Sequence, residues 1–439
     1  MWWCHQPYQW CEHSLKKDKK NNIQYSLFDT FKLATKRQRR VRMQENIIIE
    51  LLGIKEKKVE LFDFQVQPNE FHVWLHTKQR KQRCPNCGER TQRIHGYRTQ
   101  KIQGRLIEDK PVNIHLKKRR YLCTSCRTTF YERFSFVGRY QRHTCSVEQQ
   151  VLTYVGEHSF TSAGKMVGFS TNRVLRLFDK RTIMVNKVLP EVIAIDEFKG
   201  DADKEKFQTI IVDVLNKRII DILPDRRSKT IEEYFKRCDT GKVQVVVMDL
   251  SKRFKDAIRR ALGDPLIVAD RFHYMRQAYW GFDKVRREIQ NELGKEKRIL
   301  CKRNKELLWK SPVNLTNEQK EKVENVLKDK PRLQEAYALK NKLDEWFKTS
   351  TQHNAKEGLE GWFEQVEKAN IDAFKAVVKT FKRWKVEILN SFVYPYSNGY
   401  IEGVNNTTKV VKRTSYGIKS FTRLRKKILW RQLIREVSV

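Results

Sequence analysis

Three hydrophobic runs in this sequence are each followed by a carboxylate. The runs have the length of buried strands, and each leads directly into its acid: Val192–Ile195 into Asp196, Val243–Met248 into Asp249 and Leu266–Ala269 into Asp270. A charged group at the end of a buried strand is held at the rim of a sheet, where a reactive site needs its ligands. Each acid alone has an ordinary alternative as a helix cap or turn residue, and Asp249 stands directly before Leu-Ser-Lys, where it can cap a helix.

A fourth acid, Glu402, lies at the start of a helical segment that has a basic face. The segment from Ser397 to Arg413 has helical spacing, and one face of it carries Glu402, Asn405, Asn406, Lys409, Lys412 and Arg413. The opposite face is apolar, with Ile401, Val404 and Val411. A carboxylate at the head of a stripe of amides and cations is typical of a metal ligand beside a phosphate-binding surface. The alternative is a solvated amphipathic helix.

Four of the nine cysteines form two C-x-x-C pairs. The pairs are Cys84-Pro-Asn-Cys87 and Cys123-Thr-Ser-Cys126, with 35 residues between them. Two such turns can aim four thiolates at one ion, so the spacing predicts a closed tetrahedral site for one structural Zn²⁺. The alternative is four unrelated thiols, and His95 and His115 are the substitute ligands to consider.

A helix-turn-helix is predicted over residues 161–179. A first helix covers Val147–Val155, and the next segment places small Gly164 at a close helix crossing and Gly168 at the turn. Ser170 would cap the second helix, whose residues facing a major groove are Thr171, Asn172, Arg173 and Arg176. A plain helical hairpin that links two domains is the alternative.

From residue 190 onward, the sequence pattern predicts alternating strands and helices of an α/β fold. The five apolar runs Val192–Ile195, Ile210–Val214, Ile219–Leu223, Val243–Met248 and Leu266–Ala269 read as buried strands, and Ile231–Cys238 and Arg253–Leu262 read as helices. Their order along the chain, β, β, β, α, β, α, β, α, is that of a ribonuclease H-like core. Residues 290–390 lose the strand pattern, so we interpret them as an all-helical insertion that ends at the loop Tyr394–Gly399.

These patterns divide the chain into six parts. The predicted parts are a basic arm at 1–42, a zinc-binding domain at 43–145, a helix-turn-helix at 146–185, the first part of the core at 190–290, the helical insertion at 291–390, and the completion of the core with the Glu402 helix and basic C-terminal helices at 391–439. The arm is interpreted as disordered or as an upstream extension with Met43 as the natural start. Zinc ligation by Cys4, His5, Cys11 and His13 is disfavoured because their spacing is not that of a zinc finger.

The composition indicates a polyanionic partner. The 439 residues carry a net charge of +38, yet 39% of them are hydrophobic. That content is too apolar for a disordered basic tail, and the charge is too high for an ordinary metabolic enzyme. An extended phosphate backbone fits a charge that recurs along the whole chain. No run of 18 apolar residues and no signal peptide is present, so we expect a soluble cytoplasmic protein that does not enter a membrane.

Taken together, the motifs resemble those of a known family. The matching segments are Ala-Ile-Asp196-Glu-Phe, Val-Met-Asp249, Ala-Asp270-Arg-Phe-His273, Ser-Asn-Gly-Tyr-Ile-Glu402-Gly-Val-Asn-Asn and Lys-Arg-Thr-Ser-Tyr416-Gly417. They look like the DDE transposases of bacterial insertion sequences, specifically the ISL-three family. The likeness runs from about Met43 to Leu433 and includes the zinc module and the helix-turn-helix. The arm before Met43 has no counterpart in it.

The resemblance implies a site, a reaction and partners. By that likeness the catalytic triad is Asp196, Asp249 and Glu402, with Asp270 and His273 beside it. Two Mg²⁺ or Mn²⁺ ions roughly 3.5–4 Å apart would be held there, and Asp196 would bridge them. The enzyme would bind the terminal inverted repeats of its element and catalyse strand cleavage by water and strand transfer by the freed 3′-hydroxyl.

The expected partners come from the same likeness. They are double-stranded DNA, as transposon ends and as target, and further copies of the chain assembled on that DNA, in the bacterial nucleoid. Lys409, Lys412, Arg413 and the basic C-terminal helices would grip phosphates alongside the helix-turn-helix. Two alternatives are a catalytically silent DNA-binding regulator and a ribonuclease H-like nuclease that cuts without joining.

Overall fold

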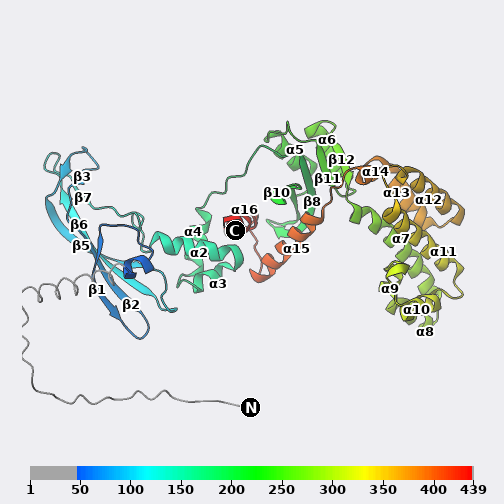
Figure 1. The fold of residues 1–439 in the computed structure, drawn as a ribbon, viewed down its shortest axis with the longest axis horizontal. Helices are drawn as coiled ribbons and strands as arrows, with labels where there is room; N and C mark the ends of the chain where they lie inside the picture. The colour runs from blue at the N-terminus through cyan, green and yellow to red at the C-terminus, as the bar shows by residue number, and fades with distance from the viewer. Residues whose placement is uncertain (1–46, 438–439) are drawn as a thin grey trace, which may run out of the picture. The chain divides into compact units, whose positions relative to one another are not determined.

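The chain forms two compact units (Figure 1). The computed structural model describes residues 47–437, and the units are Met1–Glu148 and Gln149–Val439. The arm at 1–42, with Met43 and the four Cys and His residues considered there, lies outside the described residues. Within residues 47–437, no helix has the length and apolar character needed to cross a membrane.

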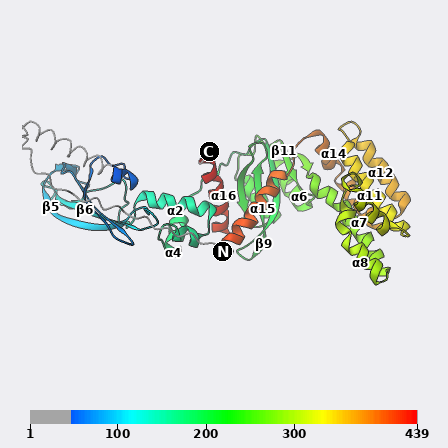
Figure 2. The ribbon, with the colours of Figure 1, turned by 60° about the horizontal axis from the view of Figure 1, so that its bottom comes forward.

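The first unit is built on a curved five-stranded sheet. Its strands are β1 (Val59–Val66), β2 (Phe71–Thr77), β5 (Ile94–Gln103), β6 (Val112–Leu122) and β7 (Thr129–Tyr131), and β3 (Gln82–Arg83) and β4 (Arg90–Thr91) form a separate hairpin. The order is β1-β2-β6-β5, and β7 also pairs with β6. Alternate residues of β6, such as Ile114 and Leu116, are fully buried, as the period of two along a strand requires. In Figure 2, β5 and β6 are seen as two long neighbouring strands.

Three helices form the predicted helix-turn-helix region. They are α2 (Cys145–Glu157), α3 (Phe160–Lys165) and α4 (Thr171–Asp179). A Cβ atom on Gly164 would lie 2.6 Å from the carbonyl oxygen of Phe169, so only glycine permits this approach. Gly168 makes the turn with φ +70°. Ser170 occupies the N-cap position of α4, but its side chain makes no capping hydrogen bond.

The second unit contains a five-stranded mixed sheet of the ribonuclease H-like type. Its strands are β8 (Val192–Ala202), β9 (Glu205–Asp213), β10 (Arg218–Leu223), β11 (Val245–Met248) and β12 (Leu266–Ala269), and α5 (Ser228–Lys236) and α6 (Lys252–Leu262) separate the later ones. The order is β10-β9-β8-β11-β12. The pairs β10–β9 and β9–β8 are antiparallel, whereas β8–β11 and β11–β12 are parallel. The predicted fold class is therefore confirmed.

Two different sets of helices cover the faces of this sheet. Ile193, Ile195 and Met248 pack in one core with residues of α5 and α6. Ala194, Val247 and Val268 belong to a second core with residues of α15 (Gly399–Thr414) and α16 (Phe421–Val437). In Figure 2 these two helices lie beside the sheet in orange and red. The first core continues into the helical insertion.

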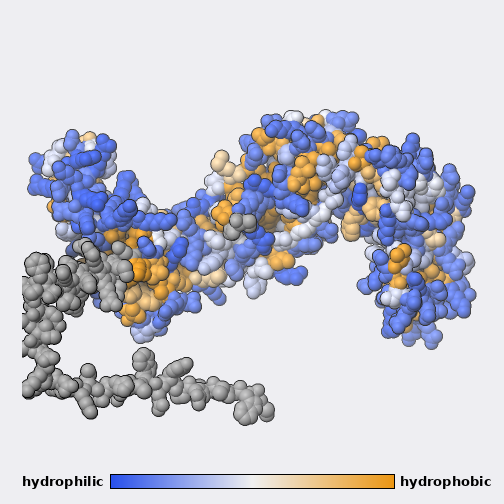
Figure 3. Space-filling view, in the orientation of Figure 1, coloured by the Kyte–Doolittle hydropathy of each residue, from blue (hydrophilic) through white to orange (hydrophobic). Residues whose placement is uncertain are grey.

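The insertion leaves the sheet after β12 and returns to the same strand. It consists of α7 (Arg271–Glu292), α8 (Lys295–Arg303), α9 (Lys305–Trp309), the short helix Pro312–Asn314, α10 (Asn317–Leu327), α11 (Pro331–Thr349), α12 (Ala355–Ala369), α13 (Asp372–Arg383) and α14 (Lys385–Val393). On return, Asn390 donates a hydrogen bond to the carbonyl of Ile267 in β12 over 2.8 Å. Hydrophilic residues cover most of its visible surface in Figure 3.

Helix α16 joins the helix-turn-helix region to the sheet. On one side, Trp430 Nε1 donates to the carbonyl of Leu152, and the fully buried Lys427 donates to that of His158. On the other side, Arg425 pairs with Asp221 of β10, and Gln432 bonds the backbone of Ile219. Most basic residues of α16 are thus engaged within the protein, because Arg423 also pairs with Asp179 and Arg431 and Arg435 pair with Glu157. The expectation that this helix grips DNA stays a prediction, and any phosphate contact by these side chains would compete with their ion pairs within the protein.

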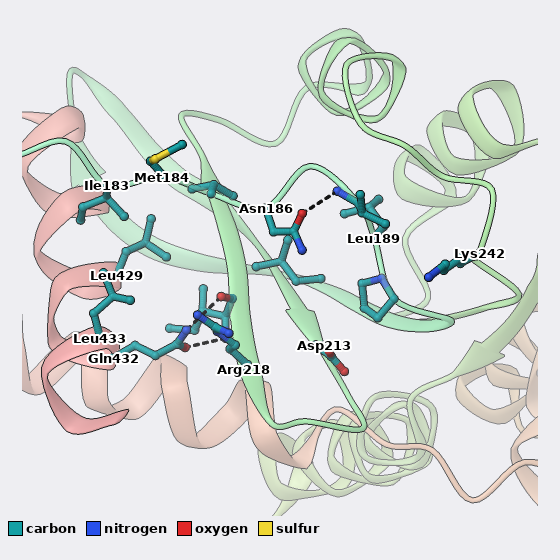
Figure 4. A pocket seen from close by; sticks show the side chains of 15 residues that line it. Ile183, Met184, Asn186, Leu189, Asp213, Arg218, Lys242, Leu429, Gln432 and Leu433 are labelled. Atoms are coloured by element: carbon teal, nitrogen blue, oxygen red, sulfur yellow. Dashed lines mark hydrogen bonds between the residues drawn. The ribbon is translucent and has the colours of Figure 1, made fainter. Parts of the chain in front are cut away.

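A pocket of about 370 Å³ lies beside this junction (Figure 4). The residues that line it come from three segments and two further positions: residues 183–186 and 188–190, residues 218–220 of β10, Leu429, Gln432 and Leu433 of α16, and Asp213 and Lys242. Its lining is mainly aliphatic, and none of the candidate catalytic acids belongs to it. The pocket is therefore separate from the chemistry that the sequence predicts.

Candidate functional site

The strand register places three acids in one row along the sheet. Ile195 pairs with Met248, and Met248 pairs with Ala269. The next residue along the chain is Asp196 within β8, Asp249 directly after β11 and Asp270 directly after β12, so the three acids start from neighbouring strands that are about 4.8 Å apart. The prediction that a strand ends before Asp196 is wrong. Beyond Ile195, β8 leaves β11 and continues to Ala202 because it pairs with β9 as a long hairpin.

Strand alternation indicates which side of the sheet Asp196 and Asp249 face, the side that α15 and α16 cover. Residues two positions before the three acids, namely Ala194, Val247 and Val268, pack in the core shared with those helices. Side chains on a strand alternate between faces, so Asp196 and Asp249 share that side. The predicted acids are thus brought together by topology, and not only by their positions after hydrophobic runs.

Burial and like charges perturb Asp196 and Asp249. Burial raises the pKa of Asp196 to about 6, and the nearby charges of Asp249 and Asp270 act in the same direction, against a hydrogen bond from the Glu197 amide and the charge of His273. Burial also raises the pKa of Asp249. Within the described chain, the buried Oδ1 atom of Asp249 has no hydrogen-bond partner. Clustered carboxylates with an orphaned oxygen fit the ligand set of a hard divalent cation.

Asp270 and His273 form a tight pair at the start of α7. His273 Nδ1 lies 2.7 Å from Asp270 Oδ2, and the backbone amide of Asn398 donates to Asp270 Oδ1 over 3.2 Å. Burial lowers the pKa of His273, but the hydrogen bond to Asp270 and the charges of Asp270 and Asp196 outweigh burial and raise it. This pair ties the loop before α15 to the row of acids.

Glu402 lies on the first turn of α15, above the same face. Its side chain is exposed and, among the residues described, has no hydrogen-bond or ion-pair partner. Asn405, one turn further along α15, donates from Nδ2 to Asp196 Oδ2 over 3.1 Å. Side chains three positions apart on a helix are neighbours, so Glu402 lies on the helix next to the residue that contacts Asp196. The described residues contain only one group of three or more metal-ligating side chains with donor atoms within 4.8 Å, and the acids are not in it.

Two polar contacts of the site were not anticipated from the sequence. Asn405 was expected on the basic face of its helix, but its bond to Asp196 has no local signal because the residues are 209 positions apart. Glu197, the acid next to Asp196, accepts from Arg226 Nη1 through both of its carboxylate oxygens. An acid paired in this way is a poorer metal ligand than its neighbour Asp196.

The single closely packed metal-binding group among the described residues is formed by the four predicted cysteines. Cys84 and Cys87 lie between β3 and β4, and Cys123 and Cys126 lie between β6 and β7. Their sulfur atoms are all within 4.8 Å of one another. The turns are similar, because Gly88 donates to the carbonyl of Cys84 and Arg127 to that of Cys123, and Gly88 and Arg127 both have positive φ. The four predicted cysteines thus form a cluster that suits structural Zn²⁺, and neither His95 nor His115 belongs to it.

Hydrogen bonds shift the pKa values of two cysteines of the cluster in opposite directions. Hydrogen bonds from Thr128 lower the pKa of Cys126 to about 5. A backbone hydrogen bond at Glu89 lowers the pKa of Cys87, but bonds shared with Cys126 and Cys123 outweigh it and raise that pKa to about 12. Four thiolates therefore need a cation to offset their mutual repulsion, which is what a Zn²⁺ ion supplies.

The predicted DNA-binding cations differ in accessibility. On α4, Arg176 is exposed, whereas Arg173 lies 3.7 Å above the ring of Phe169 and its pKa is lowered by burial. On α15, Arg413 is exposed and Lys409 bonds Asn406, but Lys412 is held by Asp201 and the carbonyl of Lys199.

Comparison with known proteins assigns all three parts of the chain to one group. A family described as transposase and named for ISL3 matches residues 193–428, a zinc finger of the transposases of IS204, IS1001, IS1096 and IS1165 matches 71–126, and the helix-turn-helix domain of transposase family ISL3 matches 132–182. The transposase of insertion sequence IS1001 from Bordetella parapertussis is 26% identical over 76% of this chain and 85% of its own length. The transposase of IS1557 from Mycobacterium tuberculosis is 24% identical over 52% of this chain and 57% of its own length. No comparison favours the silent regulator or the simple nuclease.

Proposed function

Because this chain belongs to transposase family ISL3, and is a DNA-binding and DNA-cleaving transposase, we propose that Asp196, Asp249 and Glu402 are its catalytic metal ligands. The observation that carries the proposal is the row of acids set by the strand register, faced by a helix that bonds to it through Asn405. Two of the three acids are buried enough to have raised pKa values, which is common at functional sites.

Asp196, Asp249 and Glu402 supply carboxylate oxygens, which would suit two Mg²⁺ or Mn²⁺ ions as ligands. When bound, such ions activate the attacking oxygen and stabilise the leaving oxygen of a phosphodiester. Asn405 fixes the orientation of the Asp196 carboxylate, and Asp270 fixes the imidazole of His273. Asp270 and His273 lie beside the ligands, where a protonated imidazole can attract the DNA phosphate.

Binding of the transposon ends is proposed to use the first unit and the helix-turn-helix. Asn172 and Arg176 are exposed on α4, the second helix of the motif. The chain is proposed to assemble on DNA as a homo-oligomer, since two ends of one element must be held for a joined product. Strand transfer to a target duplex follows cleavage in this scheme.

The test is cleavage of a labelled duplex that carries an end of the element, with Mg²⁺ or Mn²⁺. Asp196→Asn, Asp249→Asn and Glu402→Gln each remove a charged ligand and nearly preserve shape, so each is expected to lose cleavage and transfer by several orders of magnitude while end binding persists. Asp264→Asn, at an acid that is 90% exposed on the turn after α6, is the matched control and should retain cleavage. Normal cleavage by Glu402→Gln would contradict the assignment of the third ligand.

A further inference from the structure

Helix α7, which starts directly after Asp270, exposes two aromatic rings. Its side chains Phe272 and Trp280 are 56% and 46% exposed. The ring of Phe272 meets the imidazole of His273 edge-on, with centroids 5.8 Å apart. Isolated exposed rings are ordinary on protein surfaces. These two differ because a cation lies between them and because Phe272 contacts His273, one of the candidate catalytic residues.

Arg276 is the cation between the rings. Its Cζ atom lies 5.4 Å from the ring centroid of Phe272 and 4.8 Å from that of Trp280. Within residues 47–437 its buried Nε atom has no hydrogen-bond partner, and its guanidinium forms no ion pair. Its charge acts on His273, which places it close to the Asp270 pair. An arginine that is stacked but not neutralised keeps its donors for an anion such as a phosphate.

The spacing of the three side chains suits a nucleic acid strand. They lie one turn apart on one face of α7, so the ladder of Phe272, Arg276 and Trp280 spans about 12 Å, the length of about two nucleotides. Bases stack on aromatic side chains and on arginine planes, and the phosphate between two bases can accept from the guanidinium. In a paired duplex the base faces are covered by their neighbours, so only an unpaired nucleotide can use such a ladder.

We propose that Phe272, Arg276 and Trp280 form a stacking site for unpaired nucleotides next to the phosphate that is cleaved. The inference rests on the proposed function, because the place of the scissile phosphate is set there by Asp196, Asp249 and Glu402. The strongly basic chain favours a nucleic acid over a protein as the occupant. Opening of the duplex at the junction would then be stabilised by the enzyme before cleavage.

Photocrosslinking can detect the contact directly. End duplexes are prepared with 5-iodouracil at single positions on each side of the cleavage junction, bound to the full-length Asp196→Asn protein so that the DNA stays intact, and irradiated. Peptides crosslinked near the junction are expected to contain Phe272 or Trp280, and probes placed far from the junction are expected to miss them. Crosslinks to other parts of the chain at every position would overturn the proposal.

Cleavage kinetics give an independent readout. Phe272→Ala and Trp280→Ala are each expected to slow cleavage of a fully paired end about tenfold to a hundredfold, the loss of one stacked base. Trp280→Phe keeps a stacking face and should retain most of the rate. Substrates with a mismatch at the junction should restore the cleavage rate of the alanine variants, because the duplex is already open there.

These outcomes separate the stacking site from the catalytic proposal. If the wild-type protein cleaves and Asp196→Asn does not, the catalytic assignment stands whatever the ladder variants do. Alanine variants with a wild-type rate on paired ends would then refute the ladder alone. Retained end binding shows that the variants are folded, as their exposure leads us to expect.

Discussion

Asn405 Nδ2 donates a hydrogen bond to Asp196 Oδ2 over 3.1 Å, although the two residues are 209 positions apart. Loss of a side chain that orients a metal ligand typically lowers metal affinity or activity by 10- to 100-fold. Asn405→Ala is therefore expected to raise the Mn²⁺ concentration for half-maximal cleavage by about that factor. Titration of cleavage against metal measures it, with Asn314→Ala, at an exposed residue of the insertion, as the control. An unchanged metal requirement would show that the bond has no orienting role.

The cysteine cluster is expected to bind one equivalent of zinc. Replacement of Cys84 and Cys123 by serine removes one ligand from each turn, so the double variant should lose the metal and the fold of the first unit, since folding and metal binding are coupled there. Metal analysis of the purified protein and circular dichroism are the measurements. Cys238→Ser lies outside the cluster and should keep one equivalent. Full zinc content in the double variant would refute the site.

Lys340 makes the stability of the helical insertion depend on pH. The side chain is fully buried, with Asp344 and the carbonyls of Trp309 and Lys310 as partners, and burial lowers its pKa to about 8. The unfolded chain, with an ordinary lysine pKa near 10.4, binds more protons between about pH 8 and pH 10. The free energy of unfolding should therefore rise with pH across this window, by about 1–3 kcal/mol.

Comparison with Lys340→Met isolates that contribution. The variant has no titrating group at this position, so its unfolding free energy should rise less with pH than that of the wild type, whereas Lys342→Met, at an exposed residue of the same helix, should keep the full rise. Denaturant unfolding at pH 8, 9 and 10 is the measurement. Identical pH dependence in the wild type and in Lys340→Met would show that the buried lysine is not the cause.

Trp430 is expected to hold the helix-turn-helix against the core. Its indole donates to the carbonyl of Leu152 over 2.8 Å and meets the ring of Phe178 edge-on. Trp430→Ala removes both contacts, so backbone amides of α2 to α4 should exchange their hydrogens at least about tenfold faster, with little change in β8 to β12. Hydrogen–deuterium exchange measured by mass spectrometry tests this. Equal acceleration in the sheet would indicate a general loss of stability, and Lys419→Ala serves as the exposed control.

The sequence predicted the parts of this protein whose signals are local. Hydrophobic runs marked the central strands, paired cysteines marked the zinc ligands, and Gly164 and Gly168 marked the helix-turn-helix, because each depends on neighbours within a few residues. The extension of β8 to Ala202 was missed because the antiparallel pairing with β9 persists after the contact with β11 ends.

The other differences between the expectations from sequence and the structure involve contacts between residues far apart in the sequence. The cations of α16 carry no mark that distinguishes a phosphate contact from an ion pair with Asp179 or Glu157. The proposed stacking site on α7 could not be predicted from the sequence either. Phe272, Arg276 and Trp280 suggest a site only once the fold has placed their helix directly after Asp270. The position of Glu402 likewise depends on how α15 packs on the sheet, where Asn405 of the same helix bonds Asp196.

The two ends of the helical insertion lie together against the core. The hydroxyl of Tyr274, near its beginning, lies 3.1 Å from that of Ser391, near its end, and Asn390 bonds β12, the strand from which the chain departed. A segment whose ends are fastened together closes its own loop, so its length contributes little to the position of the residues after it. The helices of the insertion can therefore change in length or be replaced together without moving the helix that carries Glu402.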